Sequence, residues 1–323
     1  MTLKNKNMNE IKIIYSPKKS KNYIATIAIG KNYYSNWRKY ILQNWLSYCK
    51  RNSIGLLVVY KDLINKKSNN WKSPNWQKLL IGDKILTYNI NIENVCYLDT
   101  DILINPLSPN VFNYFEKDKI SLVSQVKNIP YSLDNIRRKI AFNRHYFYSK
   151  KYPLDSSLFM SLHQIYKYHN VPTQNDYACS GFFVFNIKNH SSFFKKIFYK
   201  YNIKTKTVTG GEEPLFNYEV LSKKKIKWLN YKFQALWIYE ICYRFSFLYE
   251  IKKKYNSLTK KCVESCLMDN YFLHFAGSWH ESGMWKIKNI FKSKKTNFLN
   301  KKFIEYKKIK LKGKPKGRIT GKK

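Results

Sequence analysis

Two aspartates two residues apart, Asp99 and Asp101, are the side chains whose type and spacing most directly indicate chemistry. They interrupt an apolar run over residues 95–104 that is typical of a buried strand. Side chains alternate along a strand, so both carboxylates are expected on one face. The alternative is an ordinary strand end with solvated aspartates. Because Mg²⁺ and Mn²⁺ take one or two carboxylates together with substrate phosphates, we expect a divalent-cation site for a phosphate-bearing ligand.

Two further segments carry residues suited to such a site. Glu212 and Glu213 follow two glycines and precede Pro214, as acids and proline often do in the first turn of a helix, so a structural role is one interpretation. The other places one glutamate beneath a sugar, as nucleophile, hydrogen-bond acceptor or stabiliser of positive charge. His274, on a short apolar segment before Gly277, is either a structural histidine or an imidazole ligand of the cation.

A sheet edge is needed to bring these residues together. Strands are predicted at 23–30, 55–60 and 95–104, with helices between them at 34–50 and 76–88. That order predicts βαβ units, and therefore an α/β fold with a mostly parallel central sheet flanked by helices. Ligands of such sheets bind beyond the carboxyl ends of the strands, where the aspartate pair falls.

Three more residues are predicted to lie near the ligand. Gly181, in a predicted strand over 179–186, allows the backbone to approach a bound molecule closely. Lys78 and Lys84 lie on the helix before the aspartates and are predicted to contact a diphosphate, the alternative being exposed helical lysines.

The order of these motifs gives the chain a resemblance to known families. Residues 97–103 resemble the Asp-x-Asp strand of the glycogenin and lipopolysaccharide glucosyl/galactosyltransferase family, and also the Asp-x-Asp sugar-binding region of initiating mannosyltransferases. In the first family an Asn-Ser-Gly strand follows, similar to residues 179–181, although Cys179 replaces the Asn. His274-Phe275-x-Gly277 is similar to the late His-x-x-Gly of that family, whose His is the third metal ligand.

The glutamates match less closely. The first family has Asp-Gln-x-x-x-Asn, and residues 212–217 keep this spacing with Glu212 for Asp and Glu213 for Gln. The blood-group galactosyl/GalNAc-transferase family has Asp-Glu there, with the Glu under the donor sugar, which favours Glu213. The Lys-Pro-Trp that follows the family's glycine is absent, so Lys286 or His280 is expected to replace its lysine.

The resemblance implies a GT-A (Rossmann-like) glycosyltransferase domain over residues 21–290. An acceptor-side helical insertion is expected at about 130–175, with a flexible N-terminal segment at 1–20 and a basic C-terminal tail at 291–323. Mn²⁺ or Mg²⁺ on Asp99, Asp101 and His274 would bridge the phosphates of a nucleotide-diphosphate sugar, with UDP-sugars favoured. Hexosyl transfer to a glycan or lipid-linked saccharide, with retention, is implied, in the synthesis of cell-surface polysaccharide or lipopolysaccharide.

Charge and cysteine content bear on partners and location. The 323 residues include 60 Lys+Arg against 20 Asp+Glu, a formal net charge of +40 that attracts polyanions. The basic tail is therefore predicted to bind an anionic membrane surface, the alternative being that its charge only keeps the protein in solution. Scattered cysteines and the absence of a secretory signal favour a reduced, cytoplasmic protein, peripheral on the inner face of the membrane. Cys262 and Cys266 with His274 lack a fourth ligand, which argues against zinc.

Two other functions compete with sugar transfer. Basic and aromatic residues interleave over 137–152, as in proteins that stack single-stranded nucleic acid, although no nucleic-acid motif is present and this partner is disfavoured. A sugar-phosphate nucleotidyltransferase would use a similar metal site, but the glycine-rich loop of such enzymes is missing near the first strand.

Overall fold

A computed structural model of the chain describes residues 9–147, 157–202, 206–207, 211–250, 256–277 and 280–291. The chain divides into two compact units, Met1–Lys288 and Asn289–Lys323. The basic tail predicted at 291–323 lies outside the described residues except for Phe291. None of the helices in the described ranges combines the length and the apolar composition that crossing a membrane requires.

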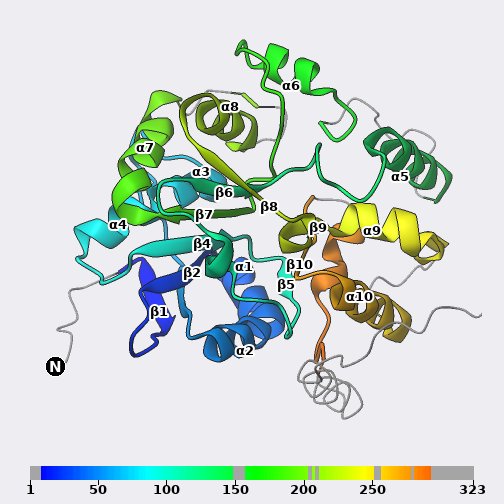
Figure 1. The fold of residues 1–323 in the computed structure, drawn as a ribbon, viewed down its shortest axis with the longest axis horizontal. Coiled ribbons are helices and arrows are strands. Elements are labelled where there is room, and N and C mark those ends of the chain that lie inside the picture. The colour runs from blue at the N-terminus through cyan, green and yellow to red at the C-terminus, as the bar shows by residue number, and fades with distance from the viewer. Residues whose placement is uncertain are drawn as a thin grey trace, which may run out of the picture. The chain divides into compact units, whose positions relative to one another are not determined.

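The centre of the first unit is a seven-stranded sheet with the order β1-β3-β2-β4-β7-β6-β8 (Figure 1). Its strands are β1 Ile11–Tyr15, β2 Asn22–Ile27, β3 Gly55–Val59, β4 Asn94–Leu98, β6 Ile120–Val123, β7 Phe182–Asn186 and β8 Ile226–Leu229. β2 runs parallel to both β3 and β4, as the predicted βαβ order requires. β7 runs antiparallel to β4 and to β6, so the sheet as a whole is mixed. The predicted α/β class is confirmed.

The N-terminal segment contributes to this sheet. Ile11–Tyr15 forms β1, an edge strand that pairs antiparallel with β3, where the sequence predicted a flexible segment over 1–20. Ile11 is buried at the end of the strand, and Tyr60 donates its backbone N–H to the carbonyl of Glu10. The alternation of apolar and polar residues in this short strand is too brief to distinguish it from a polar terminus.

Helices cover both faces of the sheet (Figure 1). They are α1 Lys31–Asn36, α2 Leu42–Asn52, α3 Pro74–Gln77, α4 Ile81–Thr87, α5 Leu133–Phe147, α6 Leu162–Tyr168, α7 Ile187–Lys200, α8 Glu213–Lys223, α9 Trp237–Arg244 and α10 Ser257–Asp269. α4, α7 and α8 share one core cluster with the sheet, in which Phe194 and Phe216 pack against Phe183 of β7. The other face of β4 presents Cys96, which lies near Cys49 of α2.

A second, three-stranded sheet lies beside the first, with the order β5-β10-β9. Its strands are β5 Ile102–Ile104, β9 Ala235–Leu236 and β10 Phe272–His274. α2 holds β5 in place, because Trp45 Nε1 donates to the Ile102 carbonyl at 2.8 Å and Asn44 exchanges two hydrogen bonds with the Ile104 backbone, at 2.7 and 2.8 Å. The single strand predicted over 95–104 is therefore two strands in two sheets.

Candidate active site

The aspartate pair lies in the turn that joins the two sheets. β4 ends at Leu98 and β5 begins at Ile102, and the N–H of Ile102 donates to the Asp99 carbonyl across the turn at 3.3 Å. The prediction that both aspartates share one face of a strand is therefore wrong in its local geometry. Their carboxylates nevertheless converge, because the turn bends the chain around the point that both face.

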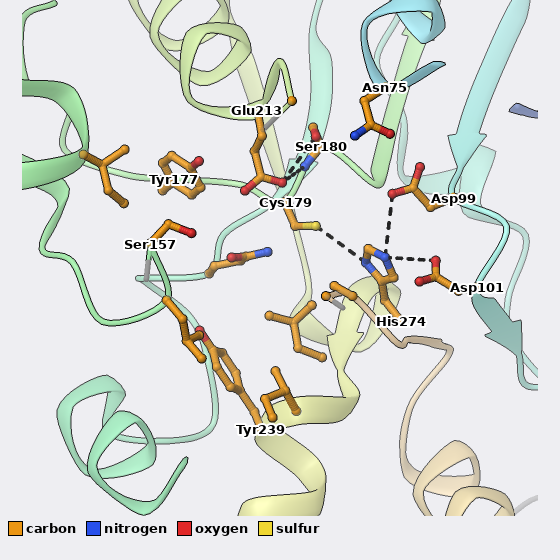
Figure 2. A pocket seen from close by; sticks show the side chains of 18 of the residues that line it. Asn75, Asp99, Asp101, Ser157, Tyr177, Cys179, Ser180, Glu213, Tyr239 and His274 are labelled. Carbon is orange, nitrogen blue, oxygen red and sulfur yellow. Dashed lines mark hydrogen bonds and ion pairs between the residues drawn. The ribbon is translucent and has the colours of Figure 1, made fainter. Parts of the chain in front are cut away.

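His274 completes this group. β10 pairs antiparallel with β5, with His274 opposite Ile102, so the imidazole reaches the turn (Figure 2). Its Nε2 lies 3.3 Å from Asp101 Oδ1 and 3.8 Å from Asp99 Oδ2. One ligand atom from each of the three residues falls within 4.8 Å of the others. Two carboxylate oxygens and one imidazole nitrogen are a donor set that suits Mn²⁺ or Mg²⁺ completed by phosphate oxygens.

Gly181 leaves room beside this group. A Cβ added there would lie 2.6 Å from Asp99 Oδ2 and 2.3 Å from His274 Cε1, closer than side chains pack. The backbone at residue 181 also braces the turn, since its carbonyl accepts from the Asp99 N–H at 2.9 Å. The backbone at Gly181 thus comes close to the carboxylate and the imidazole, and any side chain there would displace one of these two groups.

Charge is concentrated at this point. Burial raises the pKa of the Asp99 carboxyl, but the Lys78 ammonium and His274 outweigh it, so the net pKa is below its usual value. Burial lowers the pKa of His274, but Cys179 and Asp101 outweigh that effect, so the net pKa of His274 is above its usual value. The space between the carboxylates therefore stabilises positive charge, as a cation site should.

A second layer fixes the imidazole ring. Gln234 Nε2 lies 3.2 Å from His274 Nδ1 and donates to the Cys179 carbonyl at 3.1 Å. Cys179 Sγ lies 3.6 Å from the same Nδ1. All three side chains are buried. Cys179, which departs from the Asn of the resembled family, thus contacts the ring nitrogen that faces away from the aspartates.

The two glutamates occupy different environments. Glu212 is 1% exposed, and its Oε1 lies 2.7 Å from Lys78 Nζ. Lys78 also donates to the carbonyl and hydroxyl oxygens of Ser180, each at 3.0 Å. Burial lowers the pKa of Lys78, but Glu212 and Asp99 raise it more, so the ammonium stays charged. Lys78 and Glu212 both line the pocket, yet they are bound to each other.

Glu213 faces the pocket instead. It is partly exposed, and its Oε2 accepts from the Ser180 N–H at 3.0 Å and the Ser180 hydroxyl at 3.3 Å (Figure 2). One turn along α8, Asn217 Oδ1 accepts from the Ala178 N–H at 2.7 Å while its Nδ2 donates to the Ala178 carbonyl at 2.8 Å. The start of α8 and the segment that leads to β7 are therefore held together by the side chains of Glu213 and Asn217, which bond to the backbone of Ser180 and Ala178.

These groups open into one cavity of about 670 Å³. In the close view, Asp99 and Asp101 lie on one side of it, and Ser157 and Tyr239 lie away from them on the other (Figure 2). The walls on that other side come from α5, from residues 157–165 and from the segment that starts α9. The predicted helical insertion at 130–175 therefore contributes to the site through α5 and α6, with residues 148–156 outside the described part.

Part of this wall was not predicted from the sequence, and two of the predicted lysines lie outside the lining of the cavity. Arg137, Arg144 and Tyr239 line the cavity, and nothing in their local pattern distinguishes them in so basic and aromatic a chain. Lys84 of α4 and Lys286 are partly exposed and are not among the described residues that line the cavity. Lys286 lies with its Nζ 5.6 Å from the centre of the Trp285 ring. His280 begins the short 3₁₀ helix His280–Trp285.

Comparison with known proteins gives likeness of structure but not of sequence. No protein-family model matches the sequence, and no curated protein matches it. A glycosyltransferase involved in glycosylating the major capsid of PBCV-1 aligns over 82% of this chain and 98% of its own, with 9% identity and a TM-score of 0.45. The bifunctional glycosyltransferase WbbM aligns over 80% of this chain and 46% of its own, with 11% identity and a TM-score of 0.45.

The glycosyltransferase GlyE of Streptococcus pneumoniae TIGR4 aligns over 91% of this chain and 66% of its own, with 12% identity and a TM-score of 0.41. The chain thus spans about half the length of WbbM. Likenesses of this degree identify neither a donor nor an acceptor.

Proposed function

We propose that the chain is a metal-dependent glycosyltransferase that moves a hexose from a nucleotide-diphosphate sugar, with UDP-sugars favoured, to a glycan or lipid-linked saccharide. The observation that carries this proposal is the convergence of Asp99, Asp101 and His274 to within 4.8 Å in a cavity that also contains Glu213. A cation site alone fits many phosphate-binding proteins. A carboxylate held in the same cavity, beside the cation site, fits a reaction at a sugar carbon.

The chain's own residues supply three functions in this proposal. Asp99, Asp101 and His274 would hold Mn²⁺ or Mg²⁺, and Gly181 keeps the space around it open. When bound, the cation supplies positive charge to the diphosphate as the nucleotide departs. The buried pair of Lys78 with Glu212 braces Ser180, whose N–H and hydroxyl in turn orient the Glu213 carboxylate.

We assign Glu213 as the carboxylate that faces the donor sugar. In the transfer, the bond from the anomeric carbon to the diphosphate oxygen breaks, a bond to an acceptor hydroxyl oxygen forms, and the hydroxyl proton passes to the released diphosphate. Glu213 would stabilise the positive charge that develops at the anomeric carbon, with retention of its configuration. Partial exposure to the cavity supports Glu213 for this role, whereas burial and the ion pair with Lys78 support a positioning role for Glu212.

A nucleotide-sugar panel tests the proposal. The full chain is mixed with UDP- and GDP-hexoses, with and without Mn²⁺, and donor hydrolysis and thermal shift are measured. Binding to the native state should raise the melting temperature, and the rise should require the cation. Asp83→Asn, which changes a surface aspartate of α4 paired with Lys195, is the control for Asp101→Asn. The proposal fails if no nucleotide sugar is bound or hydrolysed by the folded protein.

The proposal extends to location. The net charge of +40 supports attachment of the basic tail at 291–323 to an anionic membrane surface, where a lipid-linked acceptor in polysaccharide or lipopolysaccharide synthesis would be met. Sedimentation of the full chain with phosphatidylglycerol vesicles, compared with phosphatidylcholine vesicles, tests this part. Equal binding to both lipids would contradict it.

A further inference from the structure

Arg137 lines the cavity, and its Nε has no hydrogen-bond partner in the part of the chain that the structure describes. The residue lies on α5 and is partly buried. Its Nε is shielded from solvent, and no carboxylate of the described chain forms an ion pair with the guanidinium. A shielded guanidinium N–H without an acceptor is unfavourable, because the group has lost its water and gained nothing in return. A ligand that supplies the acceptor would remove that cost.

The neighbouring arginines of α5 show that this situation is specific to Arg137. Arg138, the next residue, points to solvent, and its side chain is paired with Asp134 at 2.9 Å. Arg144, two turns along the helix, is buried, and its Nε donates to Glu281 Oε1 at 2.7 Å. Tyr249 donates to the same oxygen at 3.1 Å. The charge of Arg144 is therefore compensated by Glu281, whereas no carboxylate of the described residues pairs with Arg137.

Arg137 belongs to the acceptor side of the cavity. Burial raises the pKa of Tyr239 to about 12, and the positive charge of Arg137 opposes that rise, so the guanidinium lies near the phenol. Tyr239 lies away from Asp99 and Asp101 in the close view (Figure 2). At the cation end, Asp99, Asp101 and His274 would hold the cation that neutralises a diphosphate, and Lys78 is already bound to Glu212. The charge of Arg137 thus lies apart from the groups that would serve the diphosphate.

The cavity that contains Arg137 is partly apolar, since Leu158, Leu162, Ile165 and Val126 also line it. Where apolar side chains lower the local dielectric, a charge-assisted hydrogen bond is stronger than in bulk water. The planar fork of a guanidinium matches the paired oxygens of a phosphate or a carboxylate.

From these observations we propose that the acceptor of this enzyme carries an anionic group, a phosphate or a carboxylate, which Arg137 binds. The inference that the anionic group belongs to an acceptor rests on the proposed function, whereas the anion site itself does not depend on that function. A neutral glycan would supply no anionic acceptor to the Arg137 Nε, and would therefore be bound more weakly than its charged counterpart.

Calorimetry with matched monosaccharides tests the anion site. The probes are glucose, galactose and mannose, their 1- and 6-phosphates, and the corresponding uronic acids, each titrated into the full chain with and without saturating UDP and Mn²⁺. UDP and Mn²⁺ fill the cation site, so that a sugar phosphate cannot be mistaken for a donor. We expect at least one anionic sugar to bind about tenfold or more tightly than its neutral parent. The phosphate and uronate series identify which anion is recognised.

Two variants assign the preference to its residue. Arg137→Gln should reduce the preference for the anionic sugar by about tenfold or more, and Arg137→Lys should restore part of it, because charge is kept and the fork is lost. Arg138→Gln removes the same charge from the same helix outside the cavity and should leave the preference unchanged. Once a nucleotide sugar that the protein hydrolyses has been identified, the ratio of kcat/KM for anionic and neutral acceptors can be compared among the variants. It should be highest in wild type and Arg138→Gln, lower in Arg137→Lys and lowest in Arg137→Gln.

Other outcomes would overturn the proposal. Equal binding of anionic and neutral sugars removes the anion site, and equal effects of Arg137→Gln and Arg138→Gln reduce it to general electrostatic attraction. A loss of UDP affinity in Arg137→Gln as large as the loss of anion affinity assigns Arg137 to the donor. If no nucleotide sugar is bound, the proposed transfer fails, but calorimetry without UDP still decides whether Arg137 binds an anion.

Discussion

His274 Nε2 lies 3.3 Å from Asp101 Oδ1 because the register of a small sheet puts His274 opposite Ile102. The two residues are far apart in the sequence but lie in the same compact unit of the chain. His274 and Asp101 would not come together if the chain after β4 stayed in the central sheet. The change of sheet at the aspartate turn is therefore what builds the candidate cation site.

Removing one carboxylate should abolish cation-dependent binding. We expect Asp101→Asn to weaken Mn²⁺-dependent UDP binding at least about 100-fold, because the neutral amide is a poorer ligand for a hard cation. Isothermal titration with Mn²⁺ and UDP measures this, with Asp83→Asn as the matched surface variant. Unchanged Mn²⁺ dependence in Asp101→Asn would remove the site.

Filling the space at Gly181 should have a similar effect for a steric reason. In Gly181→Ala the methyl group would meet Asp99 Oδ2 and His274 Cε1 at 2.6 and 2.3 Å, so one of them must move. We expect Mn²⁺ affinity to fall about tenfold or more while far-UV circular dichroism stays that of the folded protein. An alanine variant with full Mn²⁺ affinity would show that a cation, if bound, lies elsewhere.

The two glutamates should separate stability from catalysis. Glu212→Gln leaves the Lys78 ammonium buried without its counter-charge, and should lower the free energy of unfolding by about 3 kcal/mol. Glu213→Gln keeps its shape at a partly exposed position and should change stability by less than about 1 kcal/mol, while lowering kcat of transfer about 100-fold or more. Chemical denaturation and single-turnover kinetics measure the two effects. The opposite distribution would exchange their roles.

Acid should reveal a third glutamate that contributes only to stability. Glu219 is 2% exposed and accepts hydrogen bonds from Lys200, from Tyr201 at 2.7 Å and from Lys223 at 2.6 Å. Burial raises the pKa of its carboxyl, but these partners outweigh that effect and the net pKa is lowered. Because the folded pKa is depressed, the stabilisation is present above the unfolded pKa of about 4.3 and is lost as pH falls.

The corresponding experiment compares wild type with Glu219→Gln. Near neutral pH the variant should be less stable by about 1–2 kcal/mol. Between about pH 5 and pH 3 the wild type should lose stability more steeply, so the two unfolding free energies approach each other. Urea denaturation across this range measures both curves. Parallel curves would show that the Glu219 carboxylate is not stabilised by its lysine partners.

The sequence predicted the cation site better than the elements that carry it. Asp99, Asp101 and His274 are recognisable by residue type and by order along the chain. The break at residues 99–101 is not, because apolar residues continue on both sides and an apolar run has the same appearance in one sheet or two. The pairing of Lys78 with Glu212 joins segments far apart in sequence, which no local pattern reports.

Lys84 does not join Lys78 at the cavity. Lys78 begins a short 3₁₀ helix, Lys78–Leu80, whereas Lys84 lies on α4, which follows it. Lys78 is 3% exposed and lines the cavity, whereas Lys84 is partly exposed on α4. The role of Arg137 could not be predicted from the sequence for another reason. Among 60 lysines and arginines, one without a counter-charge becomes visible only when its neighbours are known.

The turn between the two sheets has a thermodynamic consequence. A cation held by Asp99, Asp101 and His274 would act as a removable cross-link between two distant parts of the sequence. It would close a loop formed by the chain between residues 101 and 274. Its binding energy would add to the stability of every element in that loop. Chelation would then affect more than the proposed sugar transfer. It would loosen α9, α10 and the small sheet together, and protease sensitivity in those elements would report metal loading.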